Sequence, residues 1–216
     1  MIITRTPFRV TLGGGGTDLP SYYSKYGGFI FSCTLNKYIY INVNRPATDN
    51  FIRIKYSSSE KVDKIENIKH DIARACLGKL DITNNIEISS MADIPAGSGL
   101  GSSSSYTVGL LNALHALRRN YISLYDLAEE ACYIEIENLK KPIGKQDQYM
   151  AAYGGFTVLK IARDGSVVVE KANISYNTIE NLKRNLLIFY TGKRRLNKNI
   201  LGEQTKSTQK NEKQVL

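Results

Sequence analysis

The segment 94–105 carries the strongest chemical signal in this sequence. It reads Ile-Pro-Ala-Gly-Ser-Gly-Leu-Gly-Ser-Ser-Ser-Ser, so glycines stand at the alternate positions 97, 99 and 101. Such a loop leaves backbone N–H groups unshielded, and the apolar, helix-spaced residues after it predict a helix whose N-cap is Ser102 or Ser103. The start of a helix has unpaired N–H donors and the positive end of the helix dipole, so we expect this loop to bind a phosphate.

Three common glycine motifs do not explain the segment. The Walker pattern requires a lysine after the last glycine, where the chain has Ser102, and the dinucleotide motif G-x-G-x-x-G requires a glycine at that same position. A nucleophile elbow starting at Gly101 would need a glycine where Ser105 stands. A flexible Gly/Ser linker is the remaining alternative, but Pro95 and Leu100 interrupt the low complexity and regular structure is predicted on both sides.

A second glycine-rich segment follows the strand that alternating hydrophobicity predicts for residues 7–12. Four glycines at 13–16 lead into Thr17 and Asp18, and Arg9 precedes them. Consecutive glycines allow a ligand to approach the backbone closely. A cation and a carboxylate beside them suit a phosphorylated sugar with several hydroxyl groups. The segment therefore predicts a substrate loop, with a loose turn as the alternative.

Acidic residues supply the remaining candidates. Glu135 and Glu137 end a predicted helix, and Asp147 lies in a turn-rich segment shortly after it, between two amides. Most acids on helices are only solvated, but Asp147 is suited to act as a positioned base. The two histidines are too few for a metal site or a catalytic triad, so we expect His70 to be exposed and His115 to be structural.

The hydrophobic pattern alternates between strand and helix periodicity. The expected strands are 7–12, 29–35, 38–44, 51–56, 82–91, 156–161, 167–170 and 186–190. Those between 29 and 56 are expected to form an antiparallel meander, and a type I′ turn is expected at 164–165. The expected helices are 65–78, 102–117, one from a cap at Ser123 through 134, and one that ends at 184.

The chain has 216 residues, is 42% hydrophobic and can bury a full core. Its three cysteines are widely spaced and odd in number, and neither a leader nor a long apolar run is evident, so we expect a reduced, cytoplasmic protein with no membrane partner. Residues 193–216 carry a charge of +5 out of a net +9. A nucleic-acid-binding module is therefore an alternative but not a requirement, because +4 over residues 1–192 equally suits an enzyme for phosphorylated substrates.

Three segments together resemble the GHMP small-molecule kinases, the family of galactokinase, homoserine kinase, mevalonate kinase and phosphomevalonate kinase. They are the strand and glycines at 7–18, the glycine loop at 95–103, and Gly-Lys-Gln-Asp at 144–147. Within the family, the first and third segments are most similar to the D-glycero-D-manno-heptose 7-phosphate kinases, followed by sugar kinases of the fucokinase kind. The resemblance runs from about residue 5 to about residue 204.

This resemblance implies an α+β fold of the GHMP kinase type. Residues 1–161 would form an N-terminal nucleotide- and substrate-binding domain similar to the second domain of ribosomal protein S5. Residues 162–216 would begin a ferredoxin-like C-terminal domain and end in the basic tail. The family's third glycine-rich motif has no counterpart after Gly202, so we expect this C-terminal domain to be incomplete. The sequence leaves a homodimer open.

The resemblance also implies how ATP and Mg²⁺ would be held. The glycine loop would wrap the phosphates of ATP through Pro95, Ala96, Gly97, Ser98, Gly99, Leu100, Gly101, Ser102, Ser103 and Ser104. Ser103 and Glu135 would bind Mg²⁺, with Glu137 as the alternative to Glu135. A hydroxyl and a carboxylate suit Mg²⁺, which keeps several waters and needs few protein oxygens.

Catalytic and substrate-binding roles follow from the same resemblance. Asp147 matches the aspartate that takes the proton from the attacking hydroxyl or orients it, and Arg9 matches the basic residue near the γ-phosphate. The substrate would be bound by Gly14, Gly15, Gly16, Thr17, Asp18 and Asp147. Phosphoryl transfer requires mostly positioning and charge neutralisation, which these groups would supply.

The reaction implied by the resemblance is ATP- and Mg²⁺-dependent phosphorylation of a sugar phosphate. Its most specific form is transfer to the anomeric hydroxyl of D-glycero-D-manno-heptose 7-phosphate, which gives the 1,7-bisphosphate. Three alternatives remain: another GHMP sugar kinase such as a fucokinase, a non-catalytic sugar or nucleotide sensor or truncated inactive kinase, and a basic nucleic-acid-binding module. The missing third motif favours the second alternative, and the net charge favours the third.

Overall fold

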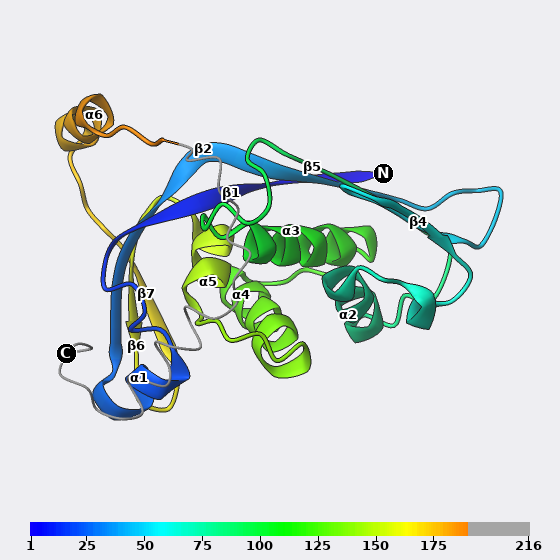
Figure 1. Cartoon of the computed structure of the whole chain (residues 1–216), viewed down its shortest axis with the longest axis horizontal. Coiled ribbons are helices and arrows are strands. Elements are labelled where there is room, and N and C mark those ends of the chain that lie inside the picture. The colour runs from blue at the N-terminus through cyan, green and yellow to red at the C-terminus, as the bar shows by residue number, and fades with distance from the viewer. Residues whose placement is uncertain (190–216) are drawn as a thin grey trace.

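The computed structural model describes residues 1–189, which form one sheet with helices α2, α3, α4 and α5 on one face (Figure 1). The seven-stranded sheet has the order β4-β3-β5-β2-β6-β7, and β1 pairs with β2. The strands are β1 (Ile2–Gly13), β2 (Gly28–Asn44), β3 (Ile52–Lys55), β4 (Ser59–Val62), β5 (Ile86–Ala92), β6 (Phe156–Ile161) and β7 (Val167–Lys171). The helices are α1 (Pro20–Tyr26), the 3-10 helix η1 (Ile65–Asn67), α2 (Asp71–Lys79), α3 (Ser102–Leu117), α4 (Leu124–Cys132), the π-helix η2 (Tyr133–Asn138), α5 (Gln146–Tyr153) and α6 (Tyr176–Asn185).

Strand β2 is the longest strand and joins the two ends of the sheet. Its residues 39–44 pair with β5 and its residues 28–33 pair with β6, while β1 pairs with it along the opposite edge. The expectation of two separate strands here is therefore wrong. No glycine or proline interrupts β2, and a register shift between Pro7 and Arg9 of β1 accommodates the unpaired residues 35–37.

The antiparallel meander expected for the first strands is wrong for β3. This strand pairs parallel with β5, from Ile52 opposite Ile86 to Lys55 opposite Ser89, and antiparallel with β4. The chain passes through β4, η1 and α2 between β3 and β5, and a parallel pair requires such a crossover. The strand expected at 82–91 begins four residues later than predicted.

The helix expected at 65–78 is divided into η1 and α2. His70 is the N-cap of α2, where its Nδ1 accepts a hydrogen bond from a backbone N–H three residues later (3.3 Å). The His70 ring lies 4.7 Å from the ring centroids of Tyr56 and Tyr106, so its expected exposure is wrong. Helix α2 ends one residue after Gly78.

Helix α3 forms the centre of the hydrophobic core. Eleven of its sixteen residues are buried, because it contacts the sheet as well as α2, α4 and α5. Gly109 lets α3 approach β1 closely: a Cβ there would lie 2.6 Å from the hydroxyl of Thr6, and Thr4 donates to the Gly109 carbonyl (2.8 Å). This contact fixes the glycine loop, which leads into α3, relative to β1.

Two expectations about single residues are supported. His115 is buried and its Nε2 is hydrogen-bonded to Glu130 (2.7 Å), in keeping with a structural role. Cys33, Cys76 and Cys132 are buried free thiols.

In the part of the chain that the structure describes, no helix has both the length and the apolar character needed to cross a bilayer.

The hairpin of β6 and β7 is confirmed, but its expected turn type is wrong. Only Gly165 has a left-handed backbone (φ +85°), whereas a type I′ turn needs two such residues. The N–H of Gly165 donates to the carbonyl of Ala162 (2.9 Å), which describes a type I turn followed by a left-handed glycine. Residues 186–189 form no strand, and the rest of the expected strand and the basic tail at 193–216 lie outside the described residues.

Helix α6 stands away from the sheet and its helices (Figure 1), and none of its residues is buried. Strand β7, which precedes it, is hydrogen-bonded to β6 across the expected domain boundary at 161–162. The described residues beyond 161 therefore begin as part of the first sheet. The boundary itself stays a prediction.

Gly14, which follows β1, has little room for a side chain. Its φ is +75°, and a Cβ there would lie 1.8 Å from the carbonyl oxygen of Phe29 in β2. We predict that Gly14→Ala lowers the free energy of unfolding by about 2 kcal/mol or more, because left-handed strain adds to displacement of the β2 backbone. Urea unfolding followed by circular dichroism measures the loss.

Gly13→Ala is the matched control for this prediction. A Cβ at Gly13 would meet no atom within 4 Å, so we expect little change in stability. Equal losses in the two variants would show that the glycine tract has no position with a special backbone requirement.

Candidate active site

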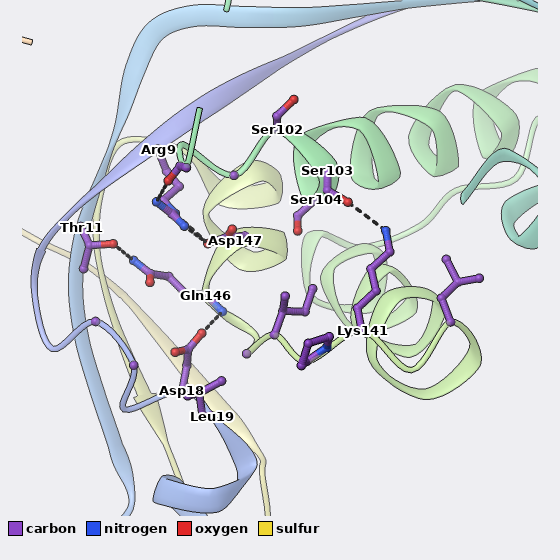
Figure 2. A pocket seen from close by; sticks show the side chains of 18 of the residues that line it. Arg9, Thr11, Asp18, Leu19, Ser102, Ser103, Ser104, Lys141, Gln146 and Asp147 are labelled. Atoms are coloured by element: carbon purple, nitrogen blue, oxygen red, sulfur yellow. Dashed lines mark hydrogen bonds and ion pairs between the residues drawn. The ribbon is translucent and has the colours of Figure 1, made fainter. Parts of the chain in front are cut away.

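A cleft of about 850 Å³ lies where three separate segments of the chain meet (Figure 2). The segments are the end of β1 with its glycine tract, the glycine loop with the first turn of α3, and residues 139–147, which run from the end of η2 into the first turn of α5. The polar and glycine residues that line it include Arg9, Thr11, Gly15, Gly16, Asp18, Gly97, Gly99, Gly101, Ser102, Ser103, Ser104, Lys140, Lys141, Gln146 and Asp147. The structure thus brings together the segments that the sequence singled out.

The glycine loop has the backbone that its sequence requires. Gly97, Gly99 and Gly101 have left-handed φ angles of +82°, +80° and +81°. Gly101 itself is the N-cap of α3, so the expectation that Ser102 or Ser103 caps the helix is wrong, because the cap position takes a conformation that glycine adopts without strain. No side chain caps α3, which leaves the N–H groups of its first turn available to an anion.

The ten loop residues predicted to wrap ATP fall into two groups. Six line the cleft: Gly97, Gly99, Gly101, Ser102, Ser103 and Ser104. Pro95, Ala96, Ser98 and Leu100 do not line it. The carbonyl of Leu100 instead accepts a hydrogen bond from the N–H of Arg9 (3.1 Å), which fastens the loop to β1. The nucleotide contacts of all ten residues stay predictions.

Arg9 of β1 and Asp147 in the first turn of α5 form an ion pair (Figure 2). The Nε and Nη2 atoms of Arg9 both lie 2.6 Å from Oδ1 of Asp147, and Nη1 donates to the carbonyl of Gly99 (3.0 Å). Because both nitrogens use the same oxygen, Arg9 does not engage Oδ2 of Asp147. The side chains are 17% and 26% exposed, so this pair is less screened by solvent than a surface pair.

Ser103, Glu135 and Lys141 meet at the start of α3. Ser103 Oγ donates to Glu135 Oε1 (2.5 Å), and Lys141 Nζ donates to Ser103 Oγ (3.0 Å) and to Glu135 Oε1 (3.3 Å). The other oxygen of Glu135 accepts from the side-chain amide of Gln148 (2.8 Å). The Glu135 side chain is 0% exposed, so these partners replace water around its carboxyl group. The two residues predicted to bind Mg²⁺ are therefore in contact.

The π-helix η2 places Glu135 in this position. It continues α4, whose expected N-cap at Ser123 is confirmed. The N–H of Leu139 donates to the carbonyl of Ile134 five residues earlier (3.0 Å), which widens the helix. The N–H of Lys141 then donates to the carbonyl of Glu135 (2.9 Å). The end of this helix therefore places Lys141 next to Glu135. Short π-helical segments are frequent at functional sites.

The Ser103–Glu135 pair fits Mg²⁺, although residues 1–189 contain no cluster of three or more His, Cys, Asp or Glu that could hold a metal. The two oxygens lie 2.5 Å apart, and both face one cationic group, the Lys141 ammonium. Hydroxyl and carboxylate oxygens are ligands that Mg²⁺ accepts, with waters and phosphate oxygens completing its shell. Glu137, the alternative ligand, is 63% exposed, pairs with Lys140 (3.4 Å) and does not line the cleft.

Asp18 lies buried beside the segment that carries Asp147. Its side-chain Oδ2 accepts from the backbone N–H of Gln146 (3.0 Å), and a Cβ at Gly144 would lie 2.1 Å from this oxygen, so only glycine fits there (Figure 2). Burial raises the pKa of Asp18; the N–H of Gln146 opposes this effect, and the charge of Asp147 adds to it. Asp18 is therefore a carboxyl group whose ionisation the fold disfavours.

The other residues of the predicted substrate loop are divided in the same way as the glycine loop. Gly15 and Gly16 line the cleft, whereas Gly14 and Thr17 do not. The hydroxyl of Thr17 is hydrogen-bonded to the carbonyl oxygens of Gly14 (2.8 Å) and Phe29 (3.0 Å), which closes the glycine turn against β2. Contacts of these residues with a substrate stay predictions.

Four polar side chains at or beside the site were not predicted from the sequence: Thr11, Lys141, Gln146 and Gln148. The amide of Gln146 donates to the hydroxyl of Thr11 (2.5 Å), and together they form a polar wall between Arg9 and Asp18 (Figure 2). Gln146 and Gln148 could have been predicted, because they flank Asp147 in the sequence. Lys141 could not, because its position depends on the π-helix that precedes it.

Lys145 anchors the start of α5, on which Asp147 lies. Its ammonium donates to both oxygens of Glu129 (2.9 and 3.0 Å), and the Tyr149 hydroxyl donates to Glu129 as well. Burial acts to lower the pKa of Lys145, but the hydrogen bond and charge of Glu129 outweigh it and raise that pKa. Burial also raises the pKa of Tyr149. The network therefore keeps a charged lysine and a neutral tyrosine at neutral pH.

Comparisons with known proteins relate this fold and cleft to the N-terminal domain of the GHMP kinases. The family model described as "GHMP kinases N terminal domain" matches residues 65–155, which include the glycine loop, Glu135 and Asp147. The structure is similar to a crystal structure described as a D-glycero-D-manno-heptose 1-phosphate kinase from Bacteroides thetaiotaomicron, with a TM-score of 0.78 and 27% identity, covering 84% of this chain and 63% of that one. The expected GHMP kinase fold is thereby confirmed.

Two curated relatives are sugar kinases by name. The chain is 30% identical over 218 residues to the D-glycero-alpha-D-manno-heptose 7-phosphate kinase of Campylobacter jejuni, covering 92% of this chain and 62% of the relative. It is 27% identical over 183 residues to a galactokinase of Chloroflexus aurantiacus, covering 75% of this chain and 44% of the relative. The chain therefore spans less than two thirds of the length of either relative.

The raised pKa of Asp18 predicts a pH dependence of stability. The folded chain holds this proton more tightly than the unfolded chain, so stability falls as pH rises from the ordinary value of 3.8 through the raised folded pKa. Asp18→Asn removes this loss. We predict that the free energy of unfolding of Asp18→Asn, relative to the unmodified protein, is higher at pH 7 than at pH 3.5, as measured by urea unfolding at both values.

Asp164→Asn is a control of opposite sign. Hydrogen bonds from the N–H and hydroxyl of Ser166 lower the pKa of Asp164, so its ionised form stabilises the fold. Asparagine at this position should therefore cost more stability at pH 7 than at low pH. A pH-independent difference for Asp18→Asn would show that Asp18 ionises without penalty.

Proposed function

We propose that this protein transfers the γ-phosphoryl group of ATP to a hydroxyl group of a sugar phosphate. The observation that carries the proposal is the Arg9–Asp147 pair beside the glycine loop, with Ser103 and Glu135 in contact at the start of the adjoining helix. The glycine loop, Arg9, Asp147 and Ser103 line one cleft, and Glu135 is buried behind Ser103. We assign to them phosphate binding, positive charge, the base and, for Ser103 with Glu135, the metal ligands. Phosphoryl transfer requires that set and little covalent chemistry from the protein.

Asp147 is the group that we assign to the attacking hydroxyl. Its Oδ2 is not engaged by Arg9 and can accept the hydroxyl proton while the sugar oxygen forms a bond to the γ-phosphorus. The bond between the γ-phosphorus and the bridging oxygen breaks, and ADP leaves with that oxygen. Arg9 holds Asp147 through Oδ1 and supplies positive charge next to the transferred group.

The nucleotide phosphates would bind at the glycine loop and the first turn of α3. The uncapped N–H groups of that turn would donate to phosphate oxygens. Ser103 and Glu135 would hold Mg²⁺, which neutralises phosphate charge when it is bound. Gln148 holds the second oxygen of Glu135 (2.8 Å), so the carboxylate is oriented before any ligand enters.

A sugar phosphate suits the part of the cleft next to Asp147. Asp18, Gln146 and Thr11 offer acceptor and donor groups to hydroxyls, and the glycines at 15 and 16 line the cleft without side chains. The heptose 7-phosphate kinase of Campylobacter jejuni, at 30% identity, supports D-glycero-D-manno-heptose 7-phosphate as the substrate. The anomeric hydroxyl is the acceptor that we assign to it. The structural neighbour is instead described as a heptose 1-phosphate kinase, so the position on the sugar is part of the proposal.

A different sugar kinase of the same family is the second candidate. The galactokinase relative, at 27% identity, favours it because the shared segments do not determine which sugar hydroxyls are recognised. A fucokinase-like activity belongs to this candidate. The nucleic-acid alternative depends on the cations at 193–216, which lie outside the described residues, and no described residue favours it.

One assay distinguishes these candidates. ADP release from ATP and Mg²⁺ is measured with D-glycero-D-manno-heptose 7-phosphate, galactose, fucose and mevalonate, and calorimetric titration with ADP and Mg²⁺ measures nucleotide binding separately. We expect turnover to be fastest with the heptose phosphate. Turnover with galactose or fucose alone would select the second candidate. Nucleotide binding without turnover on any acceptor would select a sensor or an inactive kinase.

Asp147→Asn should abolish most of the turnover in this assay. An amide cannot accept the hydroxyl proton, so we predict a fall in kcat of about 10²- to 10⁴-fold with little change in nucleotide affinity. Circular dichroism would verify that the fold is retained.

Asp81→Asn, which changes an exposed aspartate that does not line the cleft, is the matched control and should leave kcat unchanged. A fully active Asp147→Asn variant would exclude Asp147 as the base.

A further inference from the structure

The ammonium of Lys141 contacts the same two oxygens that we assign to Mg²⁺. Its Nζ lies 3.0 Å from Ser103 Oγ (Figure 2). It also lies 3.3 Å from Glu135 Oε1, and these two oxygens are 2.5 Å from each other. A lysine and a divalent cation cannot both make these contacts, because their charges repel and they need the same lone pairs. Occupation by one therefore excludes the other.

We propose that Lys141 is a tethered cation that neutralises Glu135 in the absence of metal and competes with Mg²⁺ for Ser103 and Glu135. This inference rests on the proposed function, because it takes these two residues as the metal ligands. Metal binding then requires the lysine to leave, so Lys141 sets the affinity for the metal.

The burial of Glu135 is the first step of the argument. Its side chain is fully buried, and a buried carboxylate without a countercharge is strongly unfavourable. Ser103 and Gln148 are neutral, whereas Lys141 provides a positive charge in contact with the carboxylate. Lys141 thus keeps both metal ligands oriented before the metal arrives.

The chain geometry is the second step, since it explains why Lys141 is always available. The N–H of Lys141 donates to the carbonyl of Glu135 (2.9 Å), so the backbone holds the two residues together. The Lys141 side chain is 24% exposed and lines the cleft, and its four-carbon stem lets the ammonium leave Glu135 without moving the backbone. Once displaced, the ammonium remains beside the place proposed for the phosphates.

Lys140 provides a matched control within the same turn. It carries the same charge and also lines the cleft, but its side chain is 76% exposed and pairs with Glu137 (3.4 Å) rather than with Glu135. If positive charge near the cleft weakens metal binding in general, replacing either lysine will raise the metal affinity. If Lys141 competes directly with the metal, only its replacement will raise that affinity.

The test measures binding of Mn²⁺ alone, as a probe for Mg²⁺, by electron paramagnetic resonance of the free ion, and thermal unfolding with and without Mn²⁺. For Lys141→Met we expect about tenfold tighter Mn²⁺ binding, because the metal no longer displaces a competing cation from a buried carboxylate. We also expect a lower Tm without metal and a larger rise in Tm on adding Mn²⁺. Lys140→Met should stay within about twofold of the unmodified protein, since an exposed pair contributes little.

Unchanged or weaker Mn²⁺ binding by Lys141→Met would overturn the inference. Glu135→Gln separates this failure from failure of the proposed metal site. If Glu135→Gln loses Mn²⁺ binding while Lys141→Met binds like the unmodified protein, only the competition is wrong. If Glu135→Gln binds normally, or the unmodified protein binds no Mn²⁺, the assigned ligands are wrong and the inference falls with them.

Discussion

The pairing of β1 with β2 is the constraint on which the rest of the structure depends. It runs from Ile2 opposite Val43 to Gly13 opposite Phe31, and the other edge of β2 pairs with β5 and β6. Strand β5 leads into the glycine loop, and β6 directly follows α5, which carries Asp147. Arg9 lies on β1, the glycine loop follows the end of β5, and only residues 154 and 155 separate α5 from β6. The partners of β2 therefore determine how far apart Arg9, the loop and the helix that carries Asp147 lie.

Some local features could be predicted from residue types and one tertiary contact from the family pattern, whereas the N-cap of α3, the turn at 164–165 and the remaining tertiary contacts could not. The glycine loop that leads into a helix and the Ser123 cap followed from residue types, and the meeting of Ser103 with Glu135 followed from the family pattern. The parallel pairing of β3 required knowledge of the crossover through α2. The continuity of β2 depends on a register shift in its partner, and Lys141 reaches Glu135 only because η2 ends as a π-helix. Neither the register shift nor the π-helix can be predicted from hydrophobic periodicity.

Three acidic side chains of the site differ in the partners that the fold places next to them. Asp147 contacts the guanidinium of Arg9, and Glu135 contacts the ammonium of Lys141, so each has a cation at hydrogen-bonding distance. Asp18 instead accepts a hydrogen bond from a neutral backbone N–H, and burial raises its pKa. Different surroundings give acids different roles within one site. The two paired carboxylates suit a base and a metal ligand, and Asp18 suits hydrogen bonding to a neutral hydroxyl.

Both cations also contact the glycine loop or the first turn of α3: Arg9 donates to the carbonyl of Gly99, and Lys141 donates to the hydroxyl of Ser103. Under the proposed function, a triphosphate entering the cleft offers each cation a second anionic partner. Lys141, on turning toward phosphate, releases Ser103 and Glu135 for the metal. Arg9 can contact phosphate while it holds Asp147 through Oδ1, because Oδ2 of Asp147 is free to accept the proton. Binding of the triphosphate and release of the metal ligands are then one exchange of hydrogen-bond partners by a side chain. This exchange requires no movement of the sheet.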